Sequence, residues 1–194
     1  MRMGSDMTKV IVYIATSPDG YIADEKGSVD WLPQTEEQTG GEDYGYHAFY
    51  DSVDAIAIGR KTYDQILGFG DWPYPGKISY IFSRFPKETQ LPDVKFVSES
   101  IPDFVKAIEE EKVKNLWMVG GSELIEAFYD EGFVDEFIVT VFPKVLKAGI
   151  PFKTLQKALN ADELIREKSI DYGSGVYQEH YTLKNNLIRK NKDL

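Results

Sequence analysis

The segment NLWMVGGSELIEAF, residues 115–128, constrains the fold more than any other part of the chain. Residues 115–119 are apolar and typical of a strand, whereas residues 122–132 have the composition of a helix that Gly132 ends. A strand that runs directly into a helix is a building unit of α/β folds. The two glycines between them also let a charged group approach bare backbone N–H groups, where the positive end of the helix dipole favours an anion. A tight strand-to-helix turn without a ligand is the alternative interpretation.

The remaining pattern predicts an α/β fold with a mixed sheet. Further strands are expected at residues 9–16, 55–59, 77–83, 94–97, 134–143, 162–172 and 176–183, and further helices at residues 60–67 and 100–112. A Gly-Ser-Gly sequence separates the last two strands and is typical of a hairpin. We therefore expect a three-layer domain with a mixed, mostly parallel central sheet and a C-terminal antiparallel hairpin. This domain is expected to span residues 7–184, after a short extension at 1–6 and before a basic, flexible tail at 185–194.

The composition excludes several classes of function. The 194-residue chain is 42% hydrophobic and 28% charged, as expected for one globular domain with a sizeable core. Its formal net charge of −10 argues against nucleic-acid binding, which needs a basic face. We expect neither a signal peptide nor a transmembrane helix, because the sequence shows no basic region followed by an apolar one and no apolar run of the roughly 20 residues that span a bilayer. The absence of cysteine and the distant positions of His47 and His180 argue against a metal site, and we expect a cytoplasmic protein.

Two further strand ends carry cations. Gly59 ends a predicted strand, and Arg60 and Lys61 open the next helix, where the helix dipole disfavours positive charge. A bound phosphate would remove this conflict, and a pair of solvated surface cations is the alternative. Ser83 and Arg84 follow the next strand, and the planar guanidinium of arginine can bond two oxygens of a phosphate monoester. Together with the paired glycines, these strand ends predict a ligand with several phosphates.

Four motifs, SPDGYIA, GRKTY, VGGSELIEAF and VDEFIVTVFP, occur in an order and at spacings that resemble the dihydrofolate reductase superfamily over residues 9–183. SPDGYIA and GFVDEF are more similar to the reductase domain of bacterial riboflavin biosynthesis and its stand-alone relatives. The resemblance implies a dihydrofolate reductase-like fold, a homodimer, and NADPH-dependent hydride transfer to a small heterocyclic or carbonyl substrate, pterin-like or pyrimidine-like. A riboflavin-pathway ribosylaminopyrimidine reductase is one alternative. A non-catalytic NADP-binding or sensing module is the alternative from another class.

The same resemblance implies a set of cofactor contacts. The glycine pair would hold the pyrophosphate of NADPH, and its peptide bond is expected to be cis. The Gly-Arg-x-Thr segment would bind cofactor phosphates, the Ser-Arg pair the adenosine end with its 2′-phosphate, and the end of the first strand the nicotinamide. The cofactor-binding residues implied in this way are Ala15, Thr16, Gly59, Arg60, Lys61, Thr62, Ser83, Arg84, Val119, Gly120, Gly121, Ser122, Glu123 and Leu124.

Candidate substrate contacts are fewer. The resemblance matches Thr140 to a substrate-side threonine and Trp31 to a tryptophan of a mobile loop. Asp19, in the SPDG turn, is a candidate polar contact to the substrate or, alternatively, an ordinary Asp-Gly turn residue. Trp72 and Tyr74 could wall a flat heteroaromatic ring or merely close a loop.

The catalytic carboxylate is the point where the chain departs from the family pattern. Folate reduction needs a carboxylate near the substrate to assist protonation, and counting back from the second strand places this position near Gly45. The neighbouring Glu42 and Asp43 could supply the carboxylate, or they are solvated residues at a helix start. The acidic, glycine-rich segment 35–47 around them could act as a substrate lid.

Overall fold

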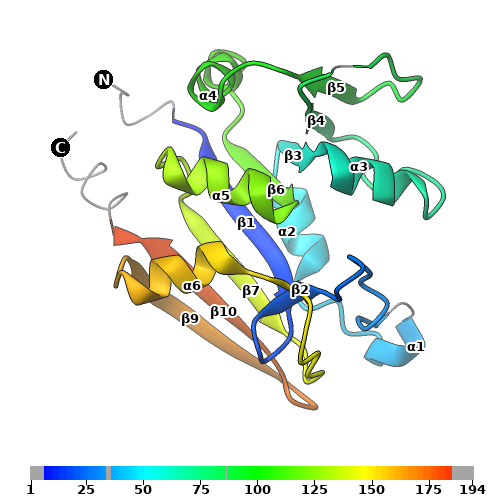
Figure 1. Cartoon of the computed structure of the whole chain (residues 1–194), viewed down its shortest axis with the longest axis vertical. Helices are drawn as coiled ribbons and strands as arrows, with labels where there is room; N and C mark the ends of the chain where they lie inside the picture. Colours follow the sequence, from blue (N-terminus) through cyan, green and yellow to red (C-terminus); the bar gives the residue numbers. More distant parts are fainter. Residues whose placement is uncertain (1–6, 34–35, 86, 185–194) are drawn as a thin grey trace.

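A central sheet of eight strands organises the chain (Figure 1). Its strands are β1 (Lys9–Thr16), β3 (Ala55–Gly59), β4 (Ile78–Phe82), β5 (Val94–Val97), β6 (Asn115–Gly120), β7 (Glu136–Val141), β9 (Leu164–Gly173) and β10 (Val176–Leu183). The structure is a computed structural model that describes residues 7–33, 36–85 and 87–184. The predicted extension at 1–6 and the predicted tail at 185–194 lie outside the described residues.

The strand order is β5-β4-β3-β6-β1-β7-β10-β9. Neighbours from β5 to β7 are parallel, whereas β10 pairs antiparallel with both β7 and β9. The predicted mixed, mostly parallel sheet with a C-terminal antiparallel hairpin is confirmed.

Three helices lie where the sequence predicts them, and the other short elements had no clear sequence signal. The predicted helices are α3 (Arg60–Leu67), α4 (Ile101–Glu110) and α5 (Ser122–Asp130). The additional elements are α1 (Glu36–Thr39), α2 (Tyr46–Ser52), α6 (Lys153–Asn160) and a small sheet of β2 (Tyr21–Ala23) with β8 (Ile150–Pro151). Within the described ranges, every helix is too short or too polar to cross a membrane.

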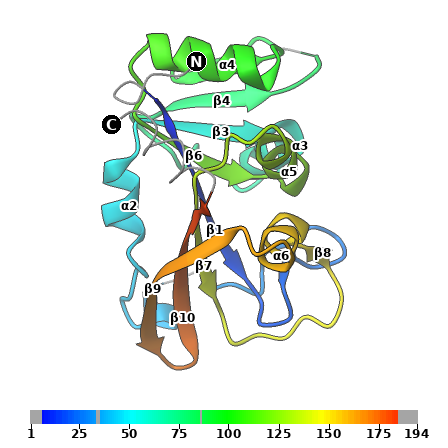
Figure 2. The ribbon, with the colours of Figure 1, turned by 90° about the vertical axis from the view of Figure 1, so that its left-hand side faces the viewer.

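Both faces of the parallel strands are buried, because alternate side chains enter two separate cores. Val10 and Val12 of β1 pack with buried residues of α4, α5 and α6, whereas Ile11 packs with those of α2 and α3. Leu116 and Trp117 of β6 divide between the two cores in the same way. Each such side chain stabilises the fold by about 1.5–3 kcal/mol when fully buried. Figure 2 shows α2 and α6 on opposite sides of the sheet, which confirms the three-layer arrangement.

The carboxyl ends of β4, β3, β6, β1 and β7 share one edge of the sheet, because these strands are parallel. From β3 the chain continues through α3 to β4, toward the β5 edge of the sheet. From the adjacent β6 it continues through α5 to β7, toward the β9 edge. The two helices belong to different cores and therefore leave this edge on opposite faces. Such a switch point is where open α/β sheets bind ligands outside the strand ends.

Candidate functional site

The turns after β3 and β6 contact each other at the switch point. A Cβ atom added to Gly59 would lie 3.2 Å from the backbone nitrogen of Gly121, and one added to Gly121 would lie 3.0 Å from Oγ1 of Thr62. Gly120 has a φ of 144°, in the region that favours glycine, and its peptide bond to Gly121 is cis, as predicted. The close approach of the two backbones therefore requires these glycines, whether or not a ligand is present.

Helices α3 and α5 begin side by side as a result of this contact. Their N-cap residues are Gly59 and Gly121, and neither helix start receives a hydrogen bond from a capping side chain. The first N–H groups of a helix have no acceptor within the helix, and the dipole makes this end positive. Two adjacent, uncapped helix starts thus create a local preference for an anion.

Arg60 and Lys61, in the first turn of α3, already have carboxylate partners. Arg60 Nε lies 2.8 Å from Oδ2 of Asp64, and Lys61 Nζ lies 3.2 Å from Oε1 of Glu123 at the start of α5. The conflict between these cations and the helix dipole is therefore relieved within the chain itself and does not require a phosphate. Exposed ion pairs are worth only about 0–1 kcal/mol, so both cations can exchange their partners for a bound anion.

Ser83 and Arg84 lie one strand further along the same edge. The Ser83 hydroxyl accepts a hydrogen bond from the Phe85 N–H at 3.1 Å and donates one to the Phe85 carbonyl at 2.9 Å. The side chain of Arg84 is exposed. The hydroxyl therefore shapes the turn, and the arginine is accessible from solvent.

On the other side of the glycine turns, β1 and β6 separate before they end. Their pairing stops at Val12 and Met118, although each strand continues toward the carboxyl edge. Ala15, beyond this point, keeps only its pairing with Thr140 of β7. The sheet thus contains a break in its hydrogen-bond ladder between the Gly120 turn and Ala15.

A cavity of about 310 Å³ lies beside this break, at the lower end of the size range for small-molecule sites. Its lining includes four residues that were predicted from the sequence and four aromatic residues that were not. The predicted residues are Ala15, Glu42, Asp43 and Thr140, and the aromatic ones are Tyr13, Tyr44, Tyr46 and Phe142. The cavity is therefore the place where one predicted substrate contact, Thr140, meets both candidate catalytic residues and Ala15 of the predicted cofactor site.

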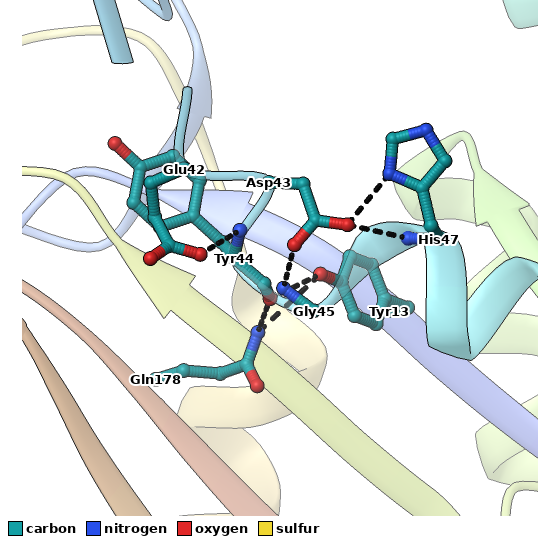
Figure 3. A network of polar contacts seen from close by, with 7 residues as sticks. All are labelled: Tyr13, Glu42, Asp43, Tyr44, Gly45, His47 and Gln178. Carbon is teal, nitrogen blue, oxygen red and sulfur yellow. Dashed lines mark hydrogen bonds and ion pairs between the residues drawn. The ribbon is translucent and has the colours of Figure 1, made fainter. Parts of the chain in front are cut away.

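A hydrogen-bond network centred on Gln178 lies against the cavity lining, and Figure 3 shows its contacts with Tyr13 and Tyr44. The Gln178 amide donates to Thr140 Oγ1 at 2.8 Å and to the Tyr44 carbonyl at 3.1 Å, and the Tyr13 hydroxyl donates to the same carbonyl at 3.0 Å. His180 Nε2 lies 2.7 Å from Gln178 Oε1, which fixes the orientation of the amide. Burial raises the pKa of Tyr13 to about 12, so its phenol stays neutral near pH 7. The network holds the Thr140 hydroxyl in one position.

The two candidate catalytic carboxylates lie at the start of α2 (Figure 3). Asp43 accepts hydrogen bonds from the N–H groups of Gly45 at 2.9 Å and His47 at 3.0 Å, and from His47 Nδ1 at 2.6 Å. These bonds, first that from the His47 N–H, lower the pKa of the Asp43 carboxyl. Glu42 Oε1 accepts a hydrogen bond from the Tyr44 N–H at 3.0 Å. Asp43 is thus ionised near neutral pH and poorly suited to donate a proton, although this residue belongs to the cavity lining.

Two other predicted substrate contacts do not line the cavity. The Asp19 carboxylate accepts hydrogen bonds from the N–H groups of Leu146 at 3.3 Å and Lys147 at 2.8 Å, and so ties two loops together. Trp31 packs edge-on against Phe142, a cavity residue, with 6.5 Å between ring centroids. Its buried indole N–H has no hydrogen-bond partner among the described residues.

Trp72 and Tyr74 have one of the two roles considered for them from the sequence, and the centre of the network was not predicted. Tyr74 is buried in the core between the sheet and α2, and Trp72 packs against it, so the pair closes a loop rather than walling the cavity. Gln178 lies in no recognisable sequence motif. The only available signal was its position in the strand that forms the C-terminal hairpin, two residues from His180 and hence on the same face.

Residues 79–176 match the sequence model of the family described as the RibD C-terminal domain. The protein YwjB of Bacillus subtilis (strain 168), described as uncharacterized, is 39% identical over 174 residues, which cover 89% of this chain and 97% of the relative. The chain belongs to the RibD C-terminal domain family. The suspected resemblance to the dihydrofolate reductase superfamily and its riboflavin branch is confirmed.

Solved structures support the same assignment of the fold. A protein of Shewanella sp. PV-4 named for riboflavin biosynthesis superposes with a TM-score of 0.77 at 29% identity, covering 91% of this chain and 99% of that one. Dihydrofolate reductase of Enterococcus faecalis, complexed with NADP(H), superposes with a TM-score of 0.62 at 15% identity, covering 95% of this chain and 99% of that one. The chain thus has the dihydrofolate reductase-like fold that the sequence predicts, which is a fold of oxidoreductases.

Proposed function

We propose that this protein is an NADPH-dependent reductase that transfers a hydride to a small heterocyclic or carbonyl substrate, pterin-like or pyrimidine-like. One observation carries the proposal: two uncapped helix starts and a substrate-sized cavity flank the same break in the sheet. A cofactor with a pyrophosphate at the helix starts would direct its nicotinamide toward the break and the cavity.

The residues at the sheet edge fit such a cofactor. In the proposal, the turns at Gly59 and Gly120–Gly121 and the first residues of α3 and α5 hold the pyrophosphate. Arg60 and Arg84 hold the 2′-phosphate, and Ala15 and the neighbouring Thr16 face the nicotinamide. When bound, NADPH supplies the hydride from C4 of the nicotinamide ring.

The residues of the cavity would position the substrate. Thr140, fixed by Gln178, offers a hydroxyl to a polar group of the substrate, and the aromatic walls exclude water from the reacting atoms. The ionised Asp43, with Glu42 beside it, would accept hydrogen bonds from substrate N–H groups and favour the protonated form of the substrate. The two carboxylates thus assist protonation by stabilising a substrate cation rather than by donating a proton.

A riboflavin-pathway ribosylaminopyrimidine reductase is the second candidate. Membership of the RibD C-terminal domain family and the similarity to the Shewanella protein favour it. A non-catalytic NADP-binding module would have the same cofactor site, but it would oxidise no NADPH with any substrate.

Calorimetric titration with NADPH and then NADH, at one fixed salt concentration, tests the proposal. We expect micromolar binding of NADPH and much weaker binding of NADH. Arg60→Ala and Arg84→Ala should each remove most of this preference. Arg166→Ala, which deletes the same charge from the distant edge strand β9, should leave it unchanged. The proposal fails if neither cofactor binds, and a broad substrate panel without turnover despite NADPH binding would indicate the non-catalytic alternative.

The proposal includes a homodimer in the cytoplasm. Strand β9 is an edge strand of the described sheet and has one row of backbone N–H and C=O groups without a neighbouring strand, as an edge available for pairing would. Sedimentation equilibrium would give twice the monomer mass if the homodimer forms, and the monomer mass if it does not.

A further inference from the structure

The charges of the cavity are all of one sign. Glu42 and Asp43 are its charged lining residues, and none of the described residues that line it is a lysine or an arginine. The backbone and side-chain hydrogen bonds of Asp43 keep this carboxylate ionised. A ligand in the cavity therefore meets negative charge without a nearby compensating cation in the lining.

The electrostatic effect of the two carboxylates reaches a neighbouring side chain. The pKa of the Tyr172 phenol is raised, first by burial and then by the charges of Glu42 and Asp43. Tyr172 packs edge-on against Tyr44, with 5.3 Å between ring centroids, so it lies directly behind a cavity wall. A second negative group in this region would be disfavoured in the same way as a phenolate.

The remaining lining is aromatic and neutral. Tyr44 packs edge-on against Phe142 with 5.1 Å between ring centroids, and Tyr13 and Tyr46 add two further rings. The hydroxyl of Thr140, one of the neutral polar groups of the lining, is buried and held by Gln178. Flat aromatic walls with neutral hydroxyl groups suit a planar ring with N–H and C=O groups.

We infer that the cavity selects an uncharged or cationic planar heterocycle and rejects substrates that carry a phosphate. Glu42 and Asp43 determine this specificity, because they attract N–H groups and repel the phosphate dianion. The inference rests on the proposed function and narrows its substrate class. The ribosylaminopyrimidine of the second candidate carries a phosphate, so the inference makes it a poor ligand of this chain, although the family match favours that candidate.

Fluorescence titration with 6-hydroxymethylpterin and with its phosphate monoester tests the inference, since the two probes differ only in the phosphate. At pH 7.5 the monoester is mainly a dianion, because its second pKa is about 6. We expect the alcohol to bind about tenfold tighter or more than the ester, which corresponds to about 1.4 kcal/mol. In the double variant Glu42→Gln/Asp43→Asn, this ratio should fall toward one through tighter binding of the ester.

Two further variants make the result specific. Glu42→Gln alone retains an oxygen for the Tyr44 N–H and should reduce the ratio even if the double variant folds poorly. Asp51→Asn removes the same charge from an exposed position on α2 outside the cavity lining and should leave the ratio unchanged.

The inference is overturned if the ester binds as tightly as the alcohol, if neither probe binds, or if Asp51→Asn changes the ratio as much as Glu42→Gln does. NADPH titration of the same samples tests the proposed function separately. NADPH binding together with tight ester binding would refute the inference and leave the reductase proposal intact. A preference for the alcohol without NADPH binding would refute the reductase proposal and leave the charge selectivity intact.

Discussion

Gly121→Ala tests whether the contact between the two glycine turns shapes the sheet edge. Gly121 has a φ of −79° and a ψ of 179°, which alanine adopts without strain, so the cost must come from the added Cβ atom. That atom would lie 3.0 Å from Oγ1 of Thr62, closer than a normal contact. The Thr62 side chain cannot easily withdraw, because a β-branched side chain is stiff at χ1. Overpacking of this kind costs about 1–3 kcal/mol.

Urea denaturation of a double-mutant cycle measures the contact itself. Thr62→Ala removes the obstructing oxygen, so Gly121→Ala should cost about 1 kcal/mol less in that background, a typical coupling for residues in contact. Thr62→Val keeps an atom in the position of the oxygen and should give no such rescue. For a domain of this size, each kcal/mol corresponds to about 2–4 °C in Tm. An equal cost of Gly121→Ala in the wild-type and Thr62→Ala backgrounds would refute the argument.

Three further predictions concern the remaining parts of the site. Arg60→Ala should weaken NADPH binding about tenfold, the factor for 1.4 kcal/mol, and an unchanged calorimetric Kd would contradict its role at the phosphate. Gln178→Leu leaves the hydroxyl of Thr140 and the carbonyl of Tyr44 without their amide donor. The free energy of unfolding, measured by urea denaturation, should therefore fall by about 1–3 kcal/mol. An unchanged free energy of unfolding would mean that water replaces the amide. Because the folded-state pKa of Asp43 is lowered, its stabilising contribution is present above the usual pKa of aspartate, about 4, and is lost as the pH falls through the lowered value. Asp43→Asn should therefore be less stable than the wild type at pH 7 and approach it in acid, and a difference independent of pH would contradict the assignment.

Elements with strong local signals could be predicted from the sequence. The β-branched run at residues 9–16 forms a strand, and the Gly-Ser-Gly turn at 173–175 closes the hairpin. Ser100, the first residue of the helix predicted at 100–112, caps α4, and its hydroxyl accepts a hydrogen bond from the Asp103 N–H at 3.3 Å. In each case, residues near one another in the chain determine the local conformation, so no tertiary information was needed.

The elements that were missed depend on contacts from outside their own segment. Helix α6 has only eight residues, too few for stability on its own, and it is held to the core by the fully buried Ala158. Strands β2 and β8 have three and two residues, and each is a strand only because the other pairs with it. A local pattern cannot reveal a pairing between residues about 130 positions apart.

The residues of the candidate site likewise divide into those with a local sequence signal and those without one. The glycines and cations at the strand ends were recognisable because each is unusual in its local position. Their partners were not, because Lys61 and Glu123 are 62 residues apart, and Gln178 and Tyr44 are 134 residues apart. The paired glycines were attributed to a ligand, whereas the structure explains them first by the contact between two turns. A local sequence pattern cannot distinguish these causes, because both require the absence of a side chain.

The central claim is that the adjacent starts of α3 and α5 bind the pyrophosphate of NADPH. The most direct test is NMR titration of uniformly 15N-labelled protein with NADPH, followed through the backbone amide signals. The account predicts that the amides of residues 59–62 and 121–124 shift together with one Kd, and that amides of the distant edge strand β9 do not move. Shifts that spare both helix starts, or that affect only one of them, would contradict the account.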